Sequence, residues 1–270
     1  MLITSRHNEQ IKRLRSLLLR KHRDRTRLFL VEGAQLVTEA AQMGAEIETL
    51  VVSPGLLSTA GRRATVAAER RGVAHMVQVT PEVMASISPR HGADGVVAVA
   101  RQRWERLEAV SPTTAPCWVA VNRIGQPWSI GTILRICAAV GGGGVILIGD
   151  STDPYDPVAV RASLGTIFSQ RLMKAGLQAF AAWKQRHGCR VIGTSPAAAA
   201  DYQEIAYQPP VVVFMGSERI GLSPEQQAIC DAMVSLPMPG RCESHHVAVA
   251  TGIVLYEALS QWRKDMRKAG

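Results

Sequence analysis

Three polar loops in the second half of the sequence carry the residues best suited to chemistry. Each loop contains glycine and follows a run of apolar residues. The first holds Asn122 and leads into a helical pattern that carries Arg135. The second holds Glu218, and the third holds Ser244 and His245. Arginine often recognises phosphate, and polar loops that contain glycine are candidates for a binding site.

A parallel sheet would bring these loops together. Strands without alternation of polar and apolar residues are predicted at residues 117–121, 145–148, 190–194, 211–215 and 233–236. Helical patterns are predicted at residues 130–140, 178–187 and 246–267. Such strands are typical of a parallel α/β sheet that is buried on both faces. Ligands bind outside the carboxyl ends of these strands, so the three loops are expected to converge on one site.

The first hundred residues predict a smaller α/β domain. Helices are expected at residues 8–22, 34–43 and 61–71, and strands at residues 28–31, 49–52, 73–79 and 95–100. Residues 102–116 mix charged residues with proline and threonine, which is typical of a linker. We therefore expect an N-terminal domain over residues 1–101, a linker over 102–116 and a second domain over 117–270.

Positive charge is concentrated near the N-terminus. The chain of 270 residues has a net charge of +9, and nine Lys or Arg residues but only two acidic residues lie between Arg6 and Arg27. A dense basic patch attracts phosphate backbones. We predict RNA contacts from four of these residues: Lys12, Arg13, Arg20 and Lys21. A solvated helix face is the alternative for such a run of charge.

Other classes of function lack their sequence signals. The glycines at 141–144 precede a strand, so they predict a helix end and a turn rather than a nucleotide fingerprint. Cys242, His245 and His246 lack a second ligand cluster, and no metal is predicted. No apolar run reaches the roughly 18 residues of a membrane span, and no membrane association is expected. The five cysteines form no CxxC pair, which favours reduced thiols and a cytoplasmic location.

The three loops, taken in order, resemble the motifs of the SpoU-type (TrmH-like) RNA 2′-O-ribose methyltransferases of the SPOUT superfamily. The first motif is matched by Asn122, Pro127, Gly131 and Arg135, and the second by Gly216, Glu218, Gly221 and Leu222. The third is matched by 236–238 (LPM), Ser244, Val247, Ala250 and 255–257 (LYE). Two positions depart from the pattern, because Ser129 and His246 stand where the family has asparagine. The resemblance covers about residues 117–265.

This resemblance implies a fold, a cofactor and an assembly. The fold would be a parallel sheet whose C-terminal segment threads a loop to make a deep trefoil knot. An L30e-like substrate-binding domain would precede it. The cofactor would be S-adenosyl-L-methionine, and the partners would be RNA and a second copy of the chain in a homodimer. The added N-terminal domain favours ribosomal over transfer RNA, and hence a role in rRNA processing through RNA methylation.

The resemblance also assigns roles to particular residues. The implied catalytic residues are Arg135, Glu218, Ser244 and Asn122. The implied cofactor contacts are Thr194, Gly216, Leu236 and His245. Because a guanidinium stays protonated, we expect Arg135 to position a phosphate and to stabilise negative charge on the ribose oxygen, with base action as the alternative. Arg135 could instead pair with a surface acid, and Glu218 could serve only to stabilise its loop.

Two other functions stay open at this point. A non-catalytic RNA-binding protein on the same fold would account for the changes at Ser129 and His246, although Arg135, Glu218 and Ser244 oppose it. An α/β enzyme that acts on a small molecule would not account for the N-terminal basic patch. Binding of the cofactor separates the first alternative from the methyltransferase, and the salt dependence of RNA affinity separates the second.

Overall fold

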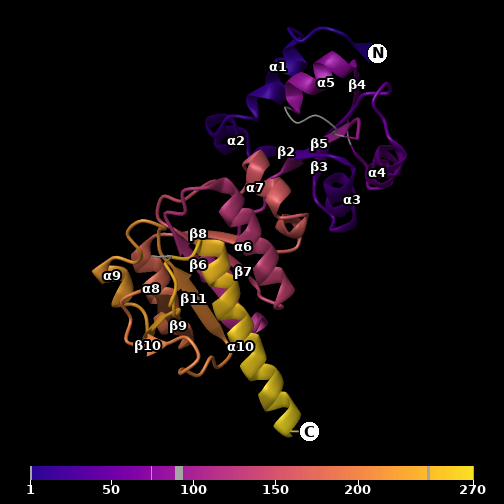
Figure 1. Ribbon diagram of the computed structural model, residues 1–270. Helices are drawn as coiled ribbons and strands as arrows, with labels where there is room; N and C mark the ends of the chain where they lie inside the picture. Colours follow the sequence, from indigo (N-terminus) through magenta and orange to yellow (C-terminus); the bar gives the residue numbers. More distant parts are fainter. Residues whose placement is uncertain (1, 74, 89–93, 242–243, 270) are drawn as a thin grey trace. The chain divides into compact units, whose positions relative to one another are not determined.

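The computed structural model describes residues 2–73, 75–88, 94–241 and 244–269. The chain divides into two compact units. Unit 1 comprises Met1–Gln102 together with Asp153–Ser169, and unit 2 comprises Arg103–Thr152 together with Gln170–Gly270. Figure 1 follows the chain through both units. The chain thus leaves unit 2 once, contributes a short segment to unit 1 and then returns.

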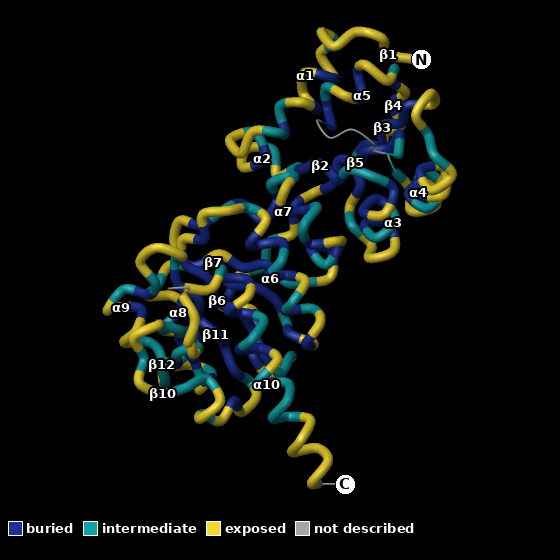
Figure 2. The backbone as a smooth tube through the Cα atoms, in the orientation of Figure 1, coloured by how far each residue is buried: buried dark blue, intermediate teal, exposed yellow. Residues whose placement is uncertain are grey.

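Unit 2 is built on a seven-stranded sheet in the order β10-β12-β9-β11-β6-β7-β8. All the pairings between these strands are parallel. The strands are β6 (Cys117–Asn122), β7 (Gly144–Ile148), β8 (Arg171–Ala175), β9 (Arg190–Thr194), β10 (Ala200–Asp201), β11 (Val211–Met215) and β12 (Ala232–Ser235). The sheet confirms the predicted parallel α/β architecture. The run of buried residues along β6, β7 and β11 is visible in Figure 2.

The described residues of unit 2 form four α-helices. They are α6 (Pro127–Ala139), α8 (Leu177–His187), α9 (Pro224–Gln227) and α10 (Val247–Ala269). The terminal helix α10, yellow in Figure 1, packs against α6 and β11. Both α6 and α10 therefore start beside the sheet edge at which the polar loops emerge.

Residues 103–116 belong to unit 2 and pack against its sheet. They form two short 3-10 helices, η1 (Leu107–Ala109) and η2 (Pro112–Thr114). Leu107 and Val110 are buried in the same apolar cluster as Trp118. The indole N–H of Trp118 donates to the Pro112 carbonyl over 2.9 Å. A stretch whose composition is typical of a linker is thus held by side chains of the sheet.

Unit 1 has a five-stranded mixed sheet in the order β1-β4-β3-β5-β2. Its strands are β1 (Leu2–Ile3), β2 (Leu28–Glu32), β3 (Ile47–Val52), β4 (His75–Val79) and β5 (Val96–Arg101). Its helices are α1 (Glu9–Ser16), α2 (Arg20–Thr26), α3 (Ala34–Gln42), α4 (Thr59–Glu69), α5 (Pro81–Ile87) and α7 (Pro157–Ala162). The last helix, α7, belongs to the segment between β7 and β8 and packs against β2.

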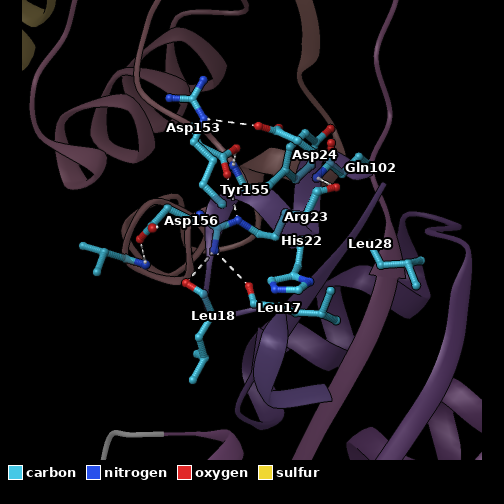
Figure 3. A network of polar contacts seen from close by, with 12 residues as sticks. Leu17, Leu18, His22, Arg23, Asp24, Leu28, Gln102, Asp153, Tyr155 and Asp156 are labelled. Carbon is cyan, nitrogen blue, oxygen red and sulfur yellow. Dashed lines mark hydrogen bonds and ion pairs between the residues drawn. The ribbon is translucent and has the colours of Figure 1, made fainter. Parts of the chain in front are cut away.

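The single helix predicted over residues 8–22 is wrong in its extent. The chain forms α1, a break at residues 17–19, and then α2. At this break the side chain of Arg23, which is 1% exposed, donates from Nη1 to the carbonyls of Leu17 and Leu18, each over 2.9 Å. The same guanidinium pairs with Asp153 over 2.7 Å and with Asp156 over 3.1 Å (Figure 3). Arg23, although it belongs to the N-terminal basic run, is therefore buried in unit 1.

Candidate active site

A pocket of about 460 Å³ lies at the carboxyl ends of β9, β11 and β12 in unit 2. These strands are neighbours in the sheet, so the loops that follow them meet. The lining residues are Thr194, Ser195, Pro196, Met215, Gly216, Ser217, Glu218, Arg219, Ile220, Gly221, Leu222, Gln227, Leu236, Met238, Ser244, His245, Val247 and Ala250. Polar and apolar side chains share this wall about equally.

The loop after β11 is a tight turn. Ser217 and Gly221 exchange two backbone hydrogen bonds, of 3.1 and 2.9 Å, and Gly221 has φ +69°. A Cβ on Gly216 would lie 2.1 Å from the carbonyl carbon of Gly221. Only glycine therefore lets the two ends of the turn approach this closely. The turn exposes its backbone to the pocket and carries Glu218 on the pocket wall.

Six of the predicted site residues line this pocket. They are Thr194, Gly216, Glu218, Leu236, Ser244 and His245. The hydroxyl of Thr194 lies 3.6 Å from the sulfur of Met215, so the ends of β9 and β11 are in contact there. The second and third motif loops thus meet at this pocket, together with the end of β9.

The other two predicted catalytic residues lie elsewhere in unit 2. Asn122 is buried at the end of β6, and Arg135 is exposed on α6. Neither side chain lines the pocket. Within the described part of the chain, Arg135 has no hydrogen bond or ion pair, which gives no support to the alternative that it pairs with a surface acid.

The two positions that depart from the family pattern contact each other. The ring of His246 lies just before α10, and its Nδ1 accepts from the backbone N–H of Ala248 over 3.2 Å. A histidine thus caps the helix as an asparagine would. Its Nε2 lies 3.1 Å from the hydroxyl of Ser129 and 2.9 Å from Oε1 of Glu218. The replacements therefore form one bonded group that joins α6, α10 and the loop after β11.

The tautomer of His246 follows from these contacts. Because Nδ1 accepts a hydrogen bond, a neutral ring carries its proton on Nε2 and donates it towards Glu218. The hydroxyl of Ser129, which is fully buried, faces the same nitrogen. This arrangement holds Glu218 in place and leaves no ring nitrogen to deprotonate Ser129, so Ser129 is not set up as a nucleophile.

The sequence analysis missed part of the pocket wall. Ser195, Pro196, Arg219 and Gln227 line the pocket but were not predicted as site residues. Ser195 and Pro196 directly follow β9, so the rule that ligands bind beyond strand ends would have found them. No sequence signal pointed to Gln227, which lies on α9 and reaches the site only through the fold.

Other locations fit a site less well. A hollow of about 630 Å³ lies between α8 and residues 228–231, but Lys184 and Asp231 pair there at 2.6 Å and no motif loop reaches it. Among the described residues, no group of three His, Cys, Asp or Glu side chains is arranged to hold a metal ion. Cys242, which was weighed as a ligand, lies outside the described residues. None of the described helices is long and apolar enough to span a membrane.

Comparisons with known proteins agree with this geometry. Residues 116–256 match the SpoU rRNA Methylase family, and residues 8–98 match the MRM3-like substrate binding domain. An uncharacterized tRNA/rRNA methyltransferase of Synechocystis sp. is 32% identical over 96% of this chain and 93% of its own. The 23S rRNA (uridine(2479)-2′-O)-methyltransferase of Streptomyces viridochromogenes is 28% identical over 96% and 92%.

A solved structure extends the likeness to the cofactor. The AdoMet-bound rRNA methyltransferase from Sinorhizobium meliloti superposes with a TM-score of 0.88 at 35% identity and covers 97% of this chain and 98% of its own. The predicted S-adenosylmethionine cofactor, the N-terminal substrate-binding domain and the catalytic interpretation are thereby confirmed, and the non-catalytic alternative is not favoured. The chain belongs to the SpoU rRNA methylase family.

Proposed function

We propose that this protein transfers a methyl group from S-adenosylmethionine to a ribose 2′-hydroxyl of ribosomal RNA. The observation that carries the proposal is the pocket. Its walls come mainly from the carboxyl ends of β9, β11 and β12 and the loops beyond them, with Gln227 of α9 and the start of α10. The Streptomyces relative is named for 2′-O methylation of 23S rRNA. Ribosomal RNA as substrate favours a cytoplasmic location.

The residues that line the pocket suit the chemistry of the cofactor. Leu222, Leu236 and Val247 offer apolar surface to an adenine ring, while the turn at Gly216 brings backbone groups close to a ligand. S-adenosylmethionine supplies, when bound, an electrophilic methyl group on a positively charged sulfonium. The carboxylate of Glu218 is on the wall and would favour that positive charge.

Transfer to a ribose oxygen requires that the hydroxyl becomes more nucleophilic. We assign to Arg135 the task of binding the neighbouring phosphate and stabilising negative charge on the oxygen. A guanidinium forms a rigid fork of donors that suits phosphate, and Arg135 is exposed and therefore accessible to RNA. Ser244, on the pocket wall, and Asn122, at the end of β6, are proposed to help orient the ribose.

A homodimer would complete this site. Arg135 does not line the pocket of its own chain, so its action there requires a second copy to bring an arginine to each pocket. Val249 and Tyr256, two turns apart on α10, are 52% and 54% exposed, which leaves an apolar stripe for such a contact. The N-terminal residues Lys12, Arg13, Arg20 and Lys21 are all exposed and are proposed to bind the RNA backbone.

The product of the reaction tests the proposal. Ribosomal RNA would be incubated with the protein and S-adenosylmethionine that carries an isotopically labelled methyl group, and then digested to nucleosides. The label should appear in 2′-O-methyl nucleosides and should be absent when cofactor is omitted. Label on a base, or binding of rRNA without any transfer, would contradict the proposal.

A further inference from the structure

Trp128 presents an aromatic ring beside the active site that the proposed reaction has not used. It lies in the first turn of α6 and is 42% exposed, although large apolar side chains are usually covered. One face of its ring stacks on His246, with ring centres 4.0 Å apart and planes inclined by 16°. Because His246 covers that face, the solvent-exposed surface of the ring is its other face and its edges.

The ring of Trp128 rests on a rigid support. His246, beneath it, is held by three contacts: Ser129, Glu218 and the N–H of Ala248. The His246 side chain is 26% exposed and Glu218 is 30% exposed, so the support lies at the rim of the pocket. An aromatic ring fixed in this way loses little conformational entropy when a flat ligand stacks on it.

The surroundings of Trp128 suit a nucleotide. Trp128 and Arg135 are seven residues apart on α6, which puts them on the same face of the helix and about 10 Å apart along its axis. The preceding loop adds Arg123, an exposed cation whose backbone has φ +51°. Non-glycine residues in this conformation are concentrated at binding sites. Exposed aromatic rings and arginine side chains are the groups on which unpaired bases of RNA stack.

We propose that Trp128 is a substrate-binding residue that stacks on a base of the RNA, at or next to the nucleotide to be methylated. This inference rests on RNA being the substrate, as proposed above. The Trp128–His246 pair is a platform that orients the nucleotide, and His246 is its positioning residue. The basic residues of α1 and α2 belong to the other unit.

Three variants separate stacking from other contributions. Trp128→Phe keeps a flat ring, Trp128→Leu keeps apolar volume without one, and Trp128→Ala removes both. The probe is a mixed-sequence single-stranded RNA, with affinity measured by anisotropy at fixed salt. Because stacking on one base contributes about 1–3 kcal/mol, Trp128→Ala and Trp128→Leu should weaken binding by roughly 5- to 150-fold, whereas Trp128→Phe should retain most of the affinity.

Cofactor affinity and assembly are measured on the same proteins. S-adenosylmethionine should bind all three variants as it binds the wild type, and sedimentation should show one unchanged oligomeric state. Trp104→Leu, a change at a partly buried tryptophan of unit 2, is the matched control and should leave RNA affinity unaltered. Equal RNA affinity in wild type and Trp128→Leu would overturn the proposal. A loss of cofactor affinity or of assembly in Trp128→Leu would also overturn it, since the ring would then support the pocket or the subunit contact.

The outcome is distinguishable from a failure of the proposed function. RNA affinity is measured without methyl transfer, so it reports on Trp128 even if no 2′-O-methyl product forms. Conversely, the wild type could methylate ribose while Trp128→Leu binds RNA as tightly as the wild type. That result would support the proposed function and refute the role of Trp128 in stacking.

Discussion

The buried guanidinium of Arg23 should contribute far more to stability than its neighbours in the basic run. We consider Arg23→Met, which keeps the aliphatic length and removes the charge. In the folded state the carboxylate of Asp153, 6% exposed, would lose its cation at 2.7 Å. The carbonyls of Leu17 and Leu18 would lose their shared donor as well.

The size of the effect follows from burial. Removing one partner of a buried ion pair costs about 3–5 kcal/mol, because the other charge remains without compensation. An unsatisfied buried carbonyl costs about 1–3 kcal/mol, but contributions that share one side chain do not add. We therefore expect Arg23→Met to lower the free energy of unfolding by about 4 kcal/mol, or roughly a thousandfold in the unfolding equilibrium.

Urea unfolding followed by circular dichroism measures this change. All five tryptophans belong to unit 2, so tryptophan fluorescence in the same titration follows that unit alone, and its transition should move less. Arg20→Met is the matched control on α2. Arg20 pairs with Asp24 at 3.5 Å between side chains that are 44% and 46% exposed, and such surface pairs contribute about 0–1 kcal/mol.

A double-mutant cycle identifies the interaction. The double variant Arg23→Met/Asp153→Asn should lose less free energy of unfolding than the sum of the two single variants. The reason is that Asp153→Asn removes the buried negative charge that Arg23→Met leaves without a partner. The reasoning is refuted if Arg23→Met costs no more than Arg20→Met, or if the two changes at Arg23 and Asp153 are additive.

Three further predictions concern other parts of the chain. Gly216→Ala should weaken cofactor binding in calorimetry and destabilise the fold by about 1–3 kcal/mol, because the new Cβ would lie 2.1 Å from the backbone of Gly221. Gly240→Ala is the control: a Cβ there would have no atom within 4 Å, so neither effect is expected. Changing Lys12, Arg13, Arg20 and Lys21 to Ala should weaken RNA binding and leave cofactor affinity unaltered. The slope of log affinity against log salt concentration should fall by about 0.7–0.9 per lost phosphate contact. Unchanged RNA affinity would indicate that these residues form only a solvated helix face. Burial raises the pKa of the Cys117 thiol from its ordinary 9.0 to about 12, so this thiol keeps its proton in the folded state while the unfolded chain ionises, and stability should fall as pH rises above 9. In thermal unfolding between pH 8 and 11, Cys117→Ala should lose less stability than the wild type, and equal losses would contradict the assignment.

The sheet of unit 2 was predictable where its strands are uniformly apolar. Residues 117–121 and 211–215 contain mainly Val and other apolar residues, and both became central strands. β8 (Arg171–Ala175) was missed because a basic residue starts it and Lys174 interrupts it, as an edge strand permits. The threading of the C-terminal segment, which the resemblance implies, stays a prediction.

The loops of the site were predictable, but their contacts were not. Gly216 and Glu218 follow a strand, and chain order together with sheet topology brings them to one edge. The bonding of Ser129 to His246 joins residues 117 positions apart, so no local pattern reveals it. The same holds for Arg23, whose partner Asp153 lies 130 positions away and whose burial is hidden within a run of similar charges.

The most direct test of the central claim is single-turnover methylation of ribosomal RNA by wild type and by Arg135→Ala, with the label assigned to ribose or base. Arg135→Ala should reduce the rate of ribose methylation by roughly two to four orders of magnitude, since its charge acts mainly in the transition state. Its affinity for S-adenosylmethionine should match that of the wild type, because Arg135 does not line the pocket. Arg135→Lys should recover little activity, because an ammonium lacks the planar fork. Full activity in Arg135→Ala, or methylation of a base instead of a ribose oxygen, would contradict the account.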